Sequence, residues 1–327
     1  MMSVLFCSVG RRAKLLTDFK KTNSEISVLA TDCSQYAPGL YSADKKFITP
    51  RVDDPYYLDC ILDICKKHNV KAITTLIDPE IEILADNREL FIKQGVLPLC
   101  PSKATSLLCF DKFKMFKFLK SKNINTVLTY DNLNDFEVGL EKNEISFPVF
   151  IKPRAGSASV GAEKVDDIVN LKSIITSNPK SGYIIQELMV GDDVDVDVYV
   201  DCISNKAVSI FSKLKIETKI GGASKTISFK DDALFDLVKE IIPHFEFFGP
   251  IDMDFFYCDG QYFLSEINPR FGGAYPHAYG AGVDFHKMII NNVDSKENVE
   301  SIGDYADDIV MLMYDDVVIK NKSELAN

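Results

Sequence analysis

Apolar and polar residues alternate along the first hundred residues in the pattern of an α/β domain. Apolar runs predict strands at 4–9, 28–31, 72–77 and 96–100, and helical periodicity predicts helices between them at 13–20, 57–67 and 81–93. Strands that alternate with helices typically form a doubly wound parallel sheet. We therefore predict an N-terminal α/β domain over residues 1–101.

A second pattern begins at Pro101-Ser102, where a proline precedes a good helix N-cap. We expect a helix over 111–122 with Asp111 as its cap, and a strand–loop–strand hairpin over 147–165. These elements predict a second, small unit over residues 102–182.

From Tyr183 onwards the pattern changes to long strands with a period of two. Between 193 and 201, valines occupy the even positions and aspartates or a tyrosine the odd ones, which predicts an antiparallel strand buried on one face only. A strand over 207–217, a helix over 233–245, paired strands within 251–267 and an extra strand in the apolar run 308–314 complete the pattern. We therefore predict an α+β unit over 183–327.

The composition excludes several classes of protein. The chain has 37 Lys and Arg against 48 Asp and Glu, a net charge of -11, which argues against nucleic acid or an anionic membrane as the partner. Its 8 cysteines form no CxxC pair, so neither a zinc site nor a disulfide framework is expected. No apolar run approaches the roughly 18 residues of a membrane span. We expect a cytoplasmic protein that acts on small molecules.

The most informative candidate chemistry lies between Tyr262 and Arg270. Residues two apart on a strand point to the same face, so Glu266 and Asn268 point together. Magnesium prefers such oxygen ligands, usually one or two carboxylates with substrate phosphates. The strand must end at Pro269, and Arg270 then reaches a developing phosphoryl charge. The segment predicts an enzyme that binds a metal and a nucleotide.

The turn near Asp259-Gly260 decides which residues stand opposite this segment. A three-residue turn pairs Asp254 with Glu266 and Asp252 with Asn268, which gathers four oxygen donors on one face. A two-residue turn would shift the register by one residue and break the cluster. We predict the three-residue turn; a solvated polar face is the alternative.

Two further segments can bind a nucleotide. A strand ends at Lys152, and the small-residue loop that follows lets backbone N–H groups approach phosphate oxygens; an ordinary flexible hairpin loop is the alternative. The loop is not a Walker A motif, because no Gly-Lys-Ser/Thr follows it. The strand that ends at Glu187-Leu188 can present backbone groups to an adenine edge, and Asp193 can bind ribose hydroxyls, although an acidic strand edge explains this segment equally well.

In this order, the segments resemble the ATP-grasp superfamily, and especially its short single-unit proteins similar to the carbamoyl-phosphate synthase large subunit. The resemblance runs to about residue 295. It implies an N-terminal domain that shapes the substrate side, followed by a two-part ATP-grasp module. This module would consist of a lid subdomain over 102–182 and a C-terminal subdomain with its terminal strand over 183–327.

The resemblance also implies roles for individual residues. The nucleotide would be bound by two phosphate lysines, a lid loop, an adenine hinge, a ribose acid and a lysine where relatives tend to carry arginine: Lys112, Lys152, Gly156, Ser157, Ser159, Gly161, Gln186, Glu187, Leu188, Asp193 and Lys215. Two Mg²⁺ ions, for which Mn²⁺ can substitute, would be held by Asp254, Glu266 and Asn268. Arg270, with Lys152, would stabilise the transition state.

The glycine-rich loop after Arg270 can offer N–H groups to an acceptor carboxylate, and we expect Gly272 and Gly273 to contact the substrate. His277 is expected to be structural rather than an acid–base group. Participation of Asp252, Lys213, Lys219 and Lys225 is left open by the sequence.

The implied activity is carboxylate–amine ligation through an acyl phosphate, with release of ADP and phosphate. Its partners would be a small carboxylate and an amine, and a homodimer is compatible with it. Three alternatives stand beside it: a bicarbonate-activating or carbamoyl-phosphate-type enzyme, a dehydrogenase and a non-catalytic nucleotide-binding regulator. The carbamoyl-phosphate-type enzyme is disfavoured because a full synthase needs two such units. The dehydrogenase is disfavoured because the first turn at 8–12 lacks a complete Gly-x-Gly-x-x-Gly. The regulator is disfavoured because it has little need of metal ligands.

Overall fold

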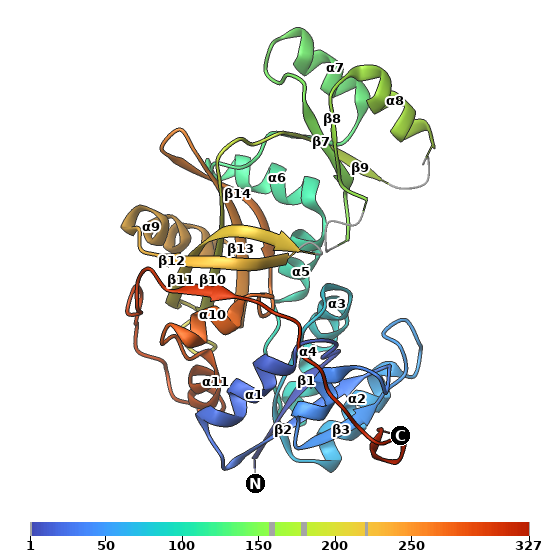
Figure 1. Cartoon of the computed structure of the whole chain (residues 1–327), viewed down its shortest axis with the longest axis vertical. Helices are drawn as coiled ribbons and strands as arrows, with labels where there is room; N and C mark the ends of the chain where they lie inside the picture. Colours follow the sequence, from blue (N-terminus) through green and yellow to red (C-terminus); the bar gives the residue numbers. More distant parts are fainter. Residues whose placement is uncertain (1, 157–160, 178–181, 220–221, 327) are drawn as a thin grey trace.

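The computed structural model describes residues 2–156, 161–177, 182–219 and 222–326, and within these ranges the strands form three sheets (Figure 1). The N-terminal sheet is parallel, with the order β3-β2-β1-β4-β5. Its strands are β1 (Met2–Cys7), β2 (Ile26–Asp32), β3 (Lys45–Ile48), β4 (Val70–Thr75) and β5 (Leu97–Pro98). The predicted doubly wound domain is confirmed.

Helices cover both faces of this sheet. On one face, α1 packs Leu16 and Phe19 into the main core, and on the other face α2 packs Ile61 into a separate cluster with Leu5. The predicted helix over 81–93 is two helices, because the chain bends at Asn87. The helical elements of the domain are α1 (Ala13–Thr22), η1 (Pro38–Ser42), α2 (Tyr57–Lys67), α3 (Asp78–Asp86) and α4 (Arg88–Lys93).

The second unit carries the four-stranded antiparallel sheet β6-β9-β7-β8, drawn in the upper part of Figure 1. Asp111 caps the predicted helix by accepting hydrogen bonds from the N–H groups of Phe113 and Lys114. Strand β9 pairs with β7 beyond the expected boundary at 182, so we propose that this subdomain ends after Glu187. Its elements are α5 (Lys103–Phe110), α6 (Lys112–Ser121), β6 (Thr129–Tyr130), α7 (Leu133–Glu141), β7 (Val149–Pro153), β8 (Glu163–Val165), α8 (Ile168–Ser177) and β9 (Tyr183–Glu187).

The third sheet is antiparallel, with the order β14-β13-β10-β11-β12-β15. Its strands are β10 (Asp192–Val200), β11 (Ala207–Lys219), β12 (Gly222–Phe229), β13 (Gly249–Cys258), β14 (Gln261–Asn268) and the expected extra strand β15 (Val310–Leu312). The helical elements in this part of the chain are α9 (Asp232–Ile241), η2 (Ile242–His244), α10 (Tyr275–Gly280), α11 (Phe285–Val293) and η3 (Lys322–Glu324).

Strand β10 is buried on both faces, so the predicted half-exposed strand is wrong. Val196 and Val198 lie in the main core as expected, but Asp195 and Asp197 on the opposite face are also buried. They are covered because the fully buried Lys213 of β11 pairs with both carboxylates and the chain after β14 passes over them at Gly272.

The turn between β13 and β14 also differs from the prediction. It has two residues, Asp259 and Gly260, with φ of 50° and 78°, because Cys258 pairs directly with Gln261. Such left-handed two-residue turns match the twist of a hairpin. The expected pairing of Asp254 with Glu266 and of Asp252 with Asn268 nevertheless forms. A bulge at Ser265 inserts one residue between the turn and the pair, which restores the register.

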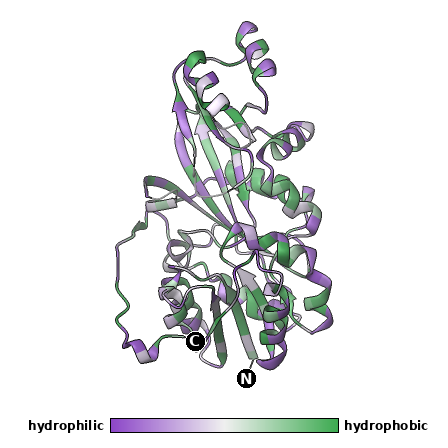
Figure 2. Ribbon diagram, turned by 90° about the vertical axis from the view of Figure 1, so that its right-hand side faces the viewer, coloured by the Kyte–Doolittle hydropathy of each residue, from purple (hydrophilic) through white to green (hydrophobic). Residues whose placement is uncertain are grey.

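The chain after β15 returns to the N-terminal domain as a long extended segment, seen at the left edge of Figure 2. It ends with Ala326 buried and its N–H donating to the Tyr41 hydroxyl at 3.3 Å. Within the described ranges, every helix is too short or too polar to span a bilayer.

Candidate active site

A cleft of about 610 Å³ opens where the three units meet. The N-terminal domain contributes Arg12 and Asp78, and the small subdomain contributes both predicted phosphate lysines. The third sheet contributes the acidic edge, which consists of Asp252, Asp254, Glu266 and Asn268 on β13 and β14. The predicted site residues that line it are Lys112, Lys152, Gly156, Gln186, Glu187, Leu188, Asp193, Lys215, Asp254, Glu266, Asn268, Arg270 and Gly273. Residues spread over more than 160 positions of the chain therefore meet in one place.

Three predicted residues behave differently or cannot be placed. Gly161 lies against the Pro153 ring and does not line the cleft. Ser157 and Ser159 fall outside the described residues. Among the described residues of this loop, Gly156 lines the cleft, and its carbonyl accepts a hydrogen bond from Lys112 Nζ at 2.6 Å.

Gly272 also lies outside the cleft lining, beneath Gly273. A Cβ at this position would lie 2.7 Å from Asp252 Oδ1 and 2.8 Å from Asp197 Oδ1, so only glycine fits without a shift. Gly272 thus packs against buried carboxylates, and the expected substrate contact is retained as a prediction for Gly273 alone.

The nucleotide side of the cleft has a free cation. Lys152 enters from β7, and within the described residues its Nζ has no hydrogen-bond or ion-pair partner. Burial lowers the pKa of Lys152, and the nearby Glu266 offsets this only in part. Val127, Phe150 and Leu188 add apolar lining. A positive charge without a counterion beside an apolar wall is suited to a phosphate chain with an aromatic base.

The hinge residue Gln186 faces partly into its own subdomain. Its side-chain amide donates to Thr129 Oγ1 at 2.8 Å, which fixes β9 against β6. The side chain is therefore a structural element of the hinge, and the neighbouring backbone at Glu187 and Leu188 is left at the cleft wall.

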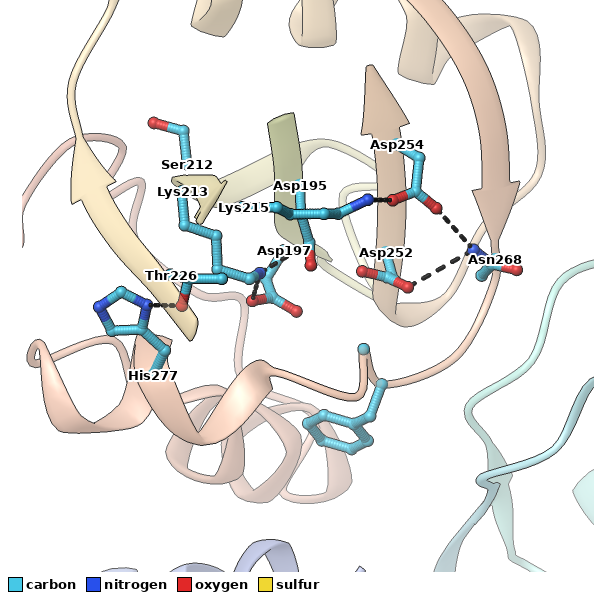
Figure 3. Close-up of polar contacts among 12 residues, drawn as sticks. Asp195, Asp197, Ser212, Lys213, Lys215, Thr226, Asp252, Asp254, Asn268 and His277 are labelled. Atoms are coloured by element: carbon cyan, nitrogen blue, oxygen red, sulfur yellow. Dashed lines mark hydrogen bonds and ion pairs between the residues drawn. The ribbon is translucent and has the colours of Figure 1, made fainter. Parts of the chain in front are cut away.

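The predicted metal ligands lie on the edge formed by β13 and β14, where Figure 3 shows Asp254 and Asn268. Asn268 Nδ2 donates to Asp254 Oδ2 at 3.3 Å and to Asp252 Oδ2 at 3.4 Å. Asp254 Oδ1 accepts from Lys215 Nζ at 2.5 Å. Glu266 Oε1 lies 3.4 Å from Lys112 Nζ. The predicted oxygen cluster therefore forms, with lysines neutralising it in this structure.

Lys215 connects the predicted ribose acid to this edge. Its Nζ lies 2.8 Å from Asp193 Oδ1 and 2.5 Å from Asp254 Oδ1. Burial alone would lower the pKa of Lys215, but Asp254 and the other carboxylates around it raise the pKa above its ordinary value. Lys215 is therefore a permanent cation.

Arg270 is held between two domains. Its Nε donates to Asp78 Oδ1 of α3 and its Nη1 to Asp252 Oδ2 of β13, both at 2.9 Å. Burial opposes the charge, but Asp78 and Asp252 together raise the Arg270 pKa. The sequence analysis did not identify Asp78, whose only signal is its place directly after the second-last strand of a parallel sheet, where ligands commonly bind.

A buried ionic cluster lies beneath the acidic edge, and the sequence analysis did not predict it. Lys213 Nζ lies 2.7 Å from Asp195 Oδ1 and 2.5 Å from Asp197 Oδ2. The carboxylates of Asp195, Asp197 and Asp252 come within 4.8 Å of one another. Burial raises the pKa values of both Asp197 and Asp252 to about 6. Because Lys213 already lies among them, this cluster fits an ion-pair network better than a second metal site.

The remaining open residues lie away from the chemistry. His277 is buried between Thr226 Oγ1 at 2.7 Å and the Ile309 carbonyl at 2.9 Å, and burial lowers its pKa to about 4, so it is a neutral structural residue as expected. Lys225 pairs with Glu217, and Lys219 lies 3.5 Å from Asp315.

Comparison with curated proteins finds ligases. The chain is 28% identical to D-alanine–D-alanine ligase B of Clostridium perfringens over 144 residues, which are 42% of this chain and 48% of that protein. It is 40% identical to D-alanine–D-alanine ligase of Clostridium botulinum over 76 residues, 22% of this chain and 24% of that protein. The chain thus spans about half or less of the length of the curated relatives it matches.

Solved structures of low sequence identity share the fold. N5-carboxyaminoimidazole synthetase from Staphylococcus aureus, complexed with ADP, superposes with a TM-score of 0.74 at 17% identity over 95% of this chain and 80% of that one. The biotin carboxylase domain of Hydrogenobacter thermophilus 2-oxoglutarate carboxylase superposes with a TM-score of 0.73 at 17% identity, over 94% of this chain and 73% of that one. L-amino acid ligase from Bacillus licheniformis superposes with a TM-score of 0.67 at 16% identity, over 91% of this chain and 75% of that one.

Two family patterns divide the chain as the fold does. The pattern of a PylC-like N-terminal domain matches residues 4–99, which form the parallel-sheet domain. The pattern of the ATP-grasp domain matches residues 109–274, half of the chain, and includes every predicted nucleotide and metal residue. The chain therefore belongs to the ATP-grasp family.

Proposed function

We propose that this protein is an ATP- and magnesium-dependent carboxylate–amine ligase that works through an acyl phosphate. The observation that supports this most is the single cleft that collects two lysines, a hinge, an acidic edge and an arginine from three units. The curated relatives reported above are named D-alanine–D-alanine ligases, which fits an enzyme that joins a carboxylate to an amine.

Lys152 and Lys112 would bind the nucleotide phosphates. Lys152 has no counterion among the described residues, so a phosphate would satisfy its charge, and Lys112 links Gly156 of the lid loop to Glu266. Phosphoryl transfer depends on positioning and charge neutralisation more than on covalent chemistry. The positions of both lysines in the cleft support this assignment.

The acidic edge fits magnesium. Asp254, Glu266 and Asn268 present hard oxygen donors from two paired strands, as magnesium prefers. The Asn268 amide now turns its nitrogen toward the carboxylates, and a half-turn of the amide would exchange this nitrogen for the oxygen. Bound magnesium supplies a Lewis acid that neutralises charge on the transferring phosphoryl group.

The reaction would proceed in two displacements. A substrate carboxylate oxygen attacks the γ-phosphorus of ATP and ADP leaves, which gives an acyl phosphate. The amine nitrogen then attacks the acyl carbon, the bond to the phosphate oxygen breaks, and the amine loses a proton as the amide forms. Arg270, fixed by Asp78 and Asp252, would stabilise the charge that develops on the transferred group.

A bicarbonate-activating enzyme is the second candidate. The biotin carboxylase domain of similar fold was solved with MgADP and bicarbonate, so this architecture can bind bicarbonate together with the nucleotide. At 17% identity that likeness concerns the fold alone, and the local sequence matches favour the amide ligase.

A phosphate- and ADP-release screen over pooled carboxylates and amines, with bicarbonate as a separate pool, tests the proposal. We expect magnesium-dependent ADP formation that requires both a carboxylate and an amine, with Mn²⁺ as a substitute, and product mass then identifies the amide. Glu266→Gln should lower turnover more than a hundredfold, while the exposed Glu300→Gln should not change it. Near-normal turnover in Glu266→Gln would refute the metal assignment, and ADP formation with bicarbonate alone would favour the second candidate.

A further inference from the structure

Five cationic side chains line the cleft within the described residues, and most of them have a partner. Lys112 contacts Glu266, Lys215 contacts Asp193 and Asp254, and Arg270 contacts Asp78 and Asp252. The two cations without a carboxylate partner in the described part of the chain are Lys152 and Arg12. Lys152 faces the nucleotide side, so Arg12 needs a separate explanation.

Arg12 is placed by the first turn of the N-terminal domain. Ser8 and Gly10 adopt left-handed conformations, with φ of 51° and 45°, and bring Arg12 to the start of α1 at the cleft. Its Nη1 donates to the Gly272 carbonyl at 2.7 Å. A guanidinium has five N–H donors, and this is its one side-chain hydrogen bond to the described residues.

The open side of the Arg12 guanidinium is bordered by Gly273. A Cβ at Gly273 would lie 3.6 Å from Nη1 and 3.8 Å from Nη2, in ordinary van der Waals contact, so Gly273 and the guanidinium border the same part of the cleft. Burial and the like charge of Arg270 together lower the Arg12 pKa to about 10, although Asp252 and Asp78 oppose this. A bound anion would offset both the burial of the Arg12 charge and its repulsion by Arg270.

Arg12 and Lys152 reach the cleft from different units. Lys152 comes from the small subdomain, whereas Arg12 comes from the N-terminal domain and lies near enough to Arg270 and Asp78 for their charges to act on its pKa, so we assign the nucleotide to Lys152 and a different anion to Arg12. The carboxylate that becomes phosphorylated belongs beside Arg270 and the acidic edge. A planar guanidinium fork matches a carboxylate through two parallel hydrogen bonds.

We propose that Arg12 binds a second substrate carboxylate, one that is not activated, and that the substrates therefore include an amino acid. This inference rests on the proposed ligase function. The carboxylate belongs either to the amine substrate, as in an α-amino acid nucleophile, or to an acyl donor that is a dicarboxylic amino acid. Both sources share the chemistry that Arg12 recognises.

The test measures binding rather than turnover. Saturation-transfer NMR with a mixture of the twenty common amino acids, magnesium and a non-hydrolysable ATP analogue compares wild type with Arg12→Met. The matched control is Arg11→Met, because Arg11 is exposed and pairs with Asp315 outside the cleft. Decarboxylated amines and monocarboxylic acids, each titrated against the carboxylated parent, distinguish the two sources.

We expect at least one amino acid to bind wild type and Arg11→Met alike, and to bind Arg12→Met roughly tenfold to a hundredfold more weakly. Arg12→Lys keeps the charge but loses the planar guanidinium, so its affinity for the amino acid should lie between those of wild type and Arg12→Met. This variant replaces Arg12→Met in the test if Arg12→Met does not fold. Unchanged binding by Arg12→Met or Arg12→Lys, or no amino-acid binding by wild type, would overturn the inference. Loss of binding in Arg12→Met without ADP formation by wild type would support Arg12 and reject the ligase.

Discussion

The buried ionic cluster predicts an unusual dependence of stability on pH. Burial raises the pKa values of Asp197 and Asp252 to about 6 from 3.8, despite the cations Lys213 and Arg270 that face them. A carboxyl group with a folded-state pKa above its unfolded value stabilises the fold below its unfolded pKa, near 4. That contribution is lost as pH rises through 6.

The size of the effect follows from the shift. About two pKa units at 1.36 kcal/mol each give about 3 kcal/mol for one carboxyl group. The carboxylates of Asp197 and Asp252 lie within 4.8 Å of each other and share their protons, so we assign about 3 kcal/mol to the pair rather than to each group. Asp197→Asn removes one titrating group and keeps an oxygen that can accept from Lys213.

Urea unfolding followed by far-ultraviolet circular dichroism, in steps from pH 4.5 to 8, measures this difference. We expect the free energy of unfolding of wild type to fall by about 2 kcal/mol relative to Asp197→Asn between pH 4.5 and 7.5, because part of the roughly 3 kcal/mol is already lost between the unfolded pKa and pH 4.5. The exposed Asp236→Asn on α9 is the control and should follow wild type. A constant difference between wild type and Asp197→Asn across this range would refute the assigned pKa shift.

Two further residues, Lys152 and Gly272, carry predictions. Lys152→Met should weaken ADP binding, measured by calorimetry, at least tenfold, because Lys152 lines the cleft and has no carboxylate partner among the described residues. The exposed Lys164→Met is the control. Since burial lowers the Lys152 pKa, wild-type affinity should fall as pH rises through that lowered pKa, and Lys152→Arg should remove the dependence. Gly272→Ala should lower the thermal midpoint and destabilise the fold by about 1–3 kcal/mol, because its Cβ would press on Asp252 and Asp197; an unchanged midpoint would contradict this packing.

The sequence allowed the layers of the fold to be predicted because burial follows local periodicity. Helix 57–67 was predicted at its observed bounds, since its apolar residues recur at helical spacing. Strand β3 was not predicted, because its Lys45-Lys46 start is a polar sheet edge without an apolar run. The break at Asn87 is a local bend inside a continuous helical pattern, so periodicity could not reveal it.

The hairpin shows why the right residues were paired through the wrong turn. Tyr262 and Leu264 face the core at even positions, whereas Ile267 faces it at an odd one, so the alternation changes parity at Ser265. A three-residue turn and a two-residue turn with one bulge produce the same partners for Glu266 and Asn268. The change of parity was visible in the sequence and marks the bulge.

The buried cluster could not be predicted because its burial is set by distant residues. Alternating aspartates and valines on β10 are typical of a half-exposed strand, and only the register with β11, which sets Lys213 opposite Asp195, makes the aspartate face an interior one. The signal that did exist was Lys213 itself, a lysine among the buried positions of a long apolar strand.

The substrate end of the cleft is built jointly by two domains. Arg12 of the N-terminal domain donates to the Gly272 carbonyl, and Arg270 donates in the opposite direction to Asp78 of the N-terminal domain. Both N-terminal residues lie within the PylC-like match at 4–99 and outside the ATP-grasp match at 109–274. The predicted nucleotide and metal residues all lie inside the ATP-grasp match, so that match carries no information on Arg12 and Asp78. The residues that choose the substrate of this protein must therefore be sought around Arg12 and Asp78.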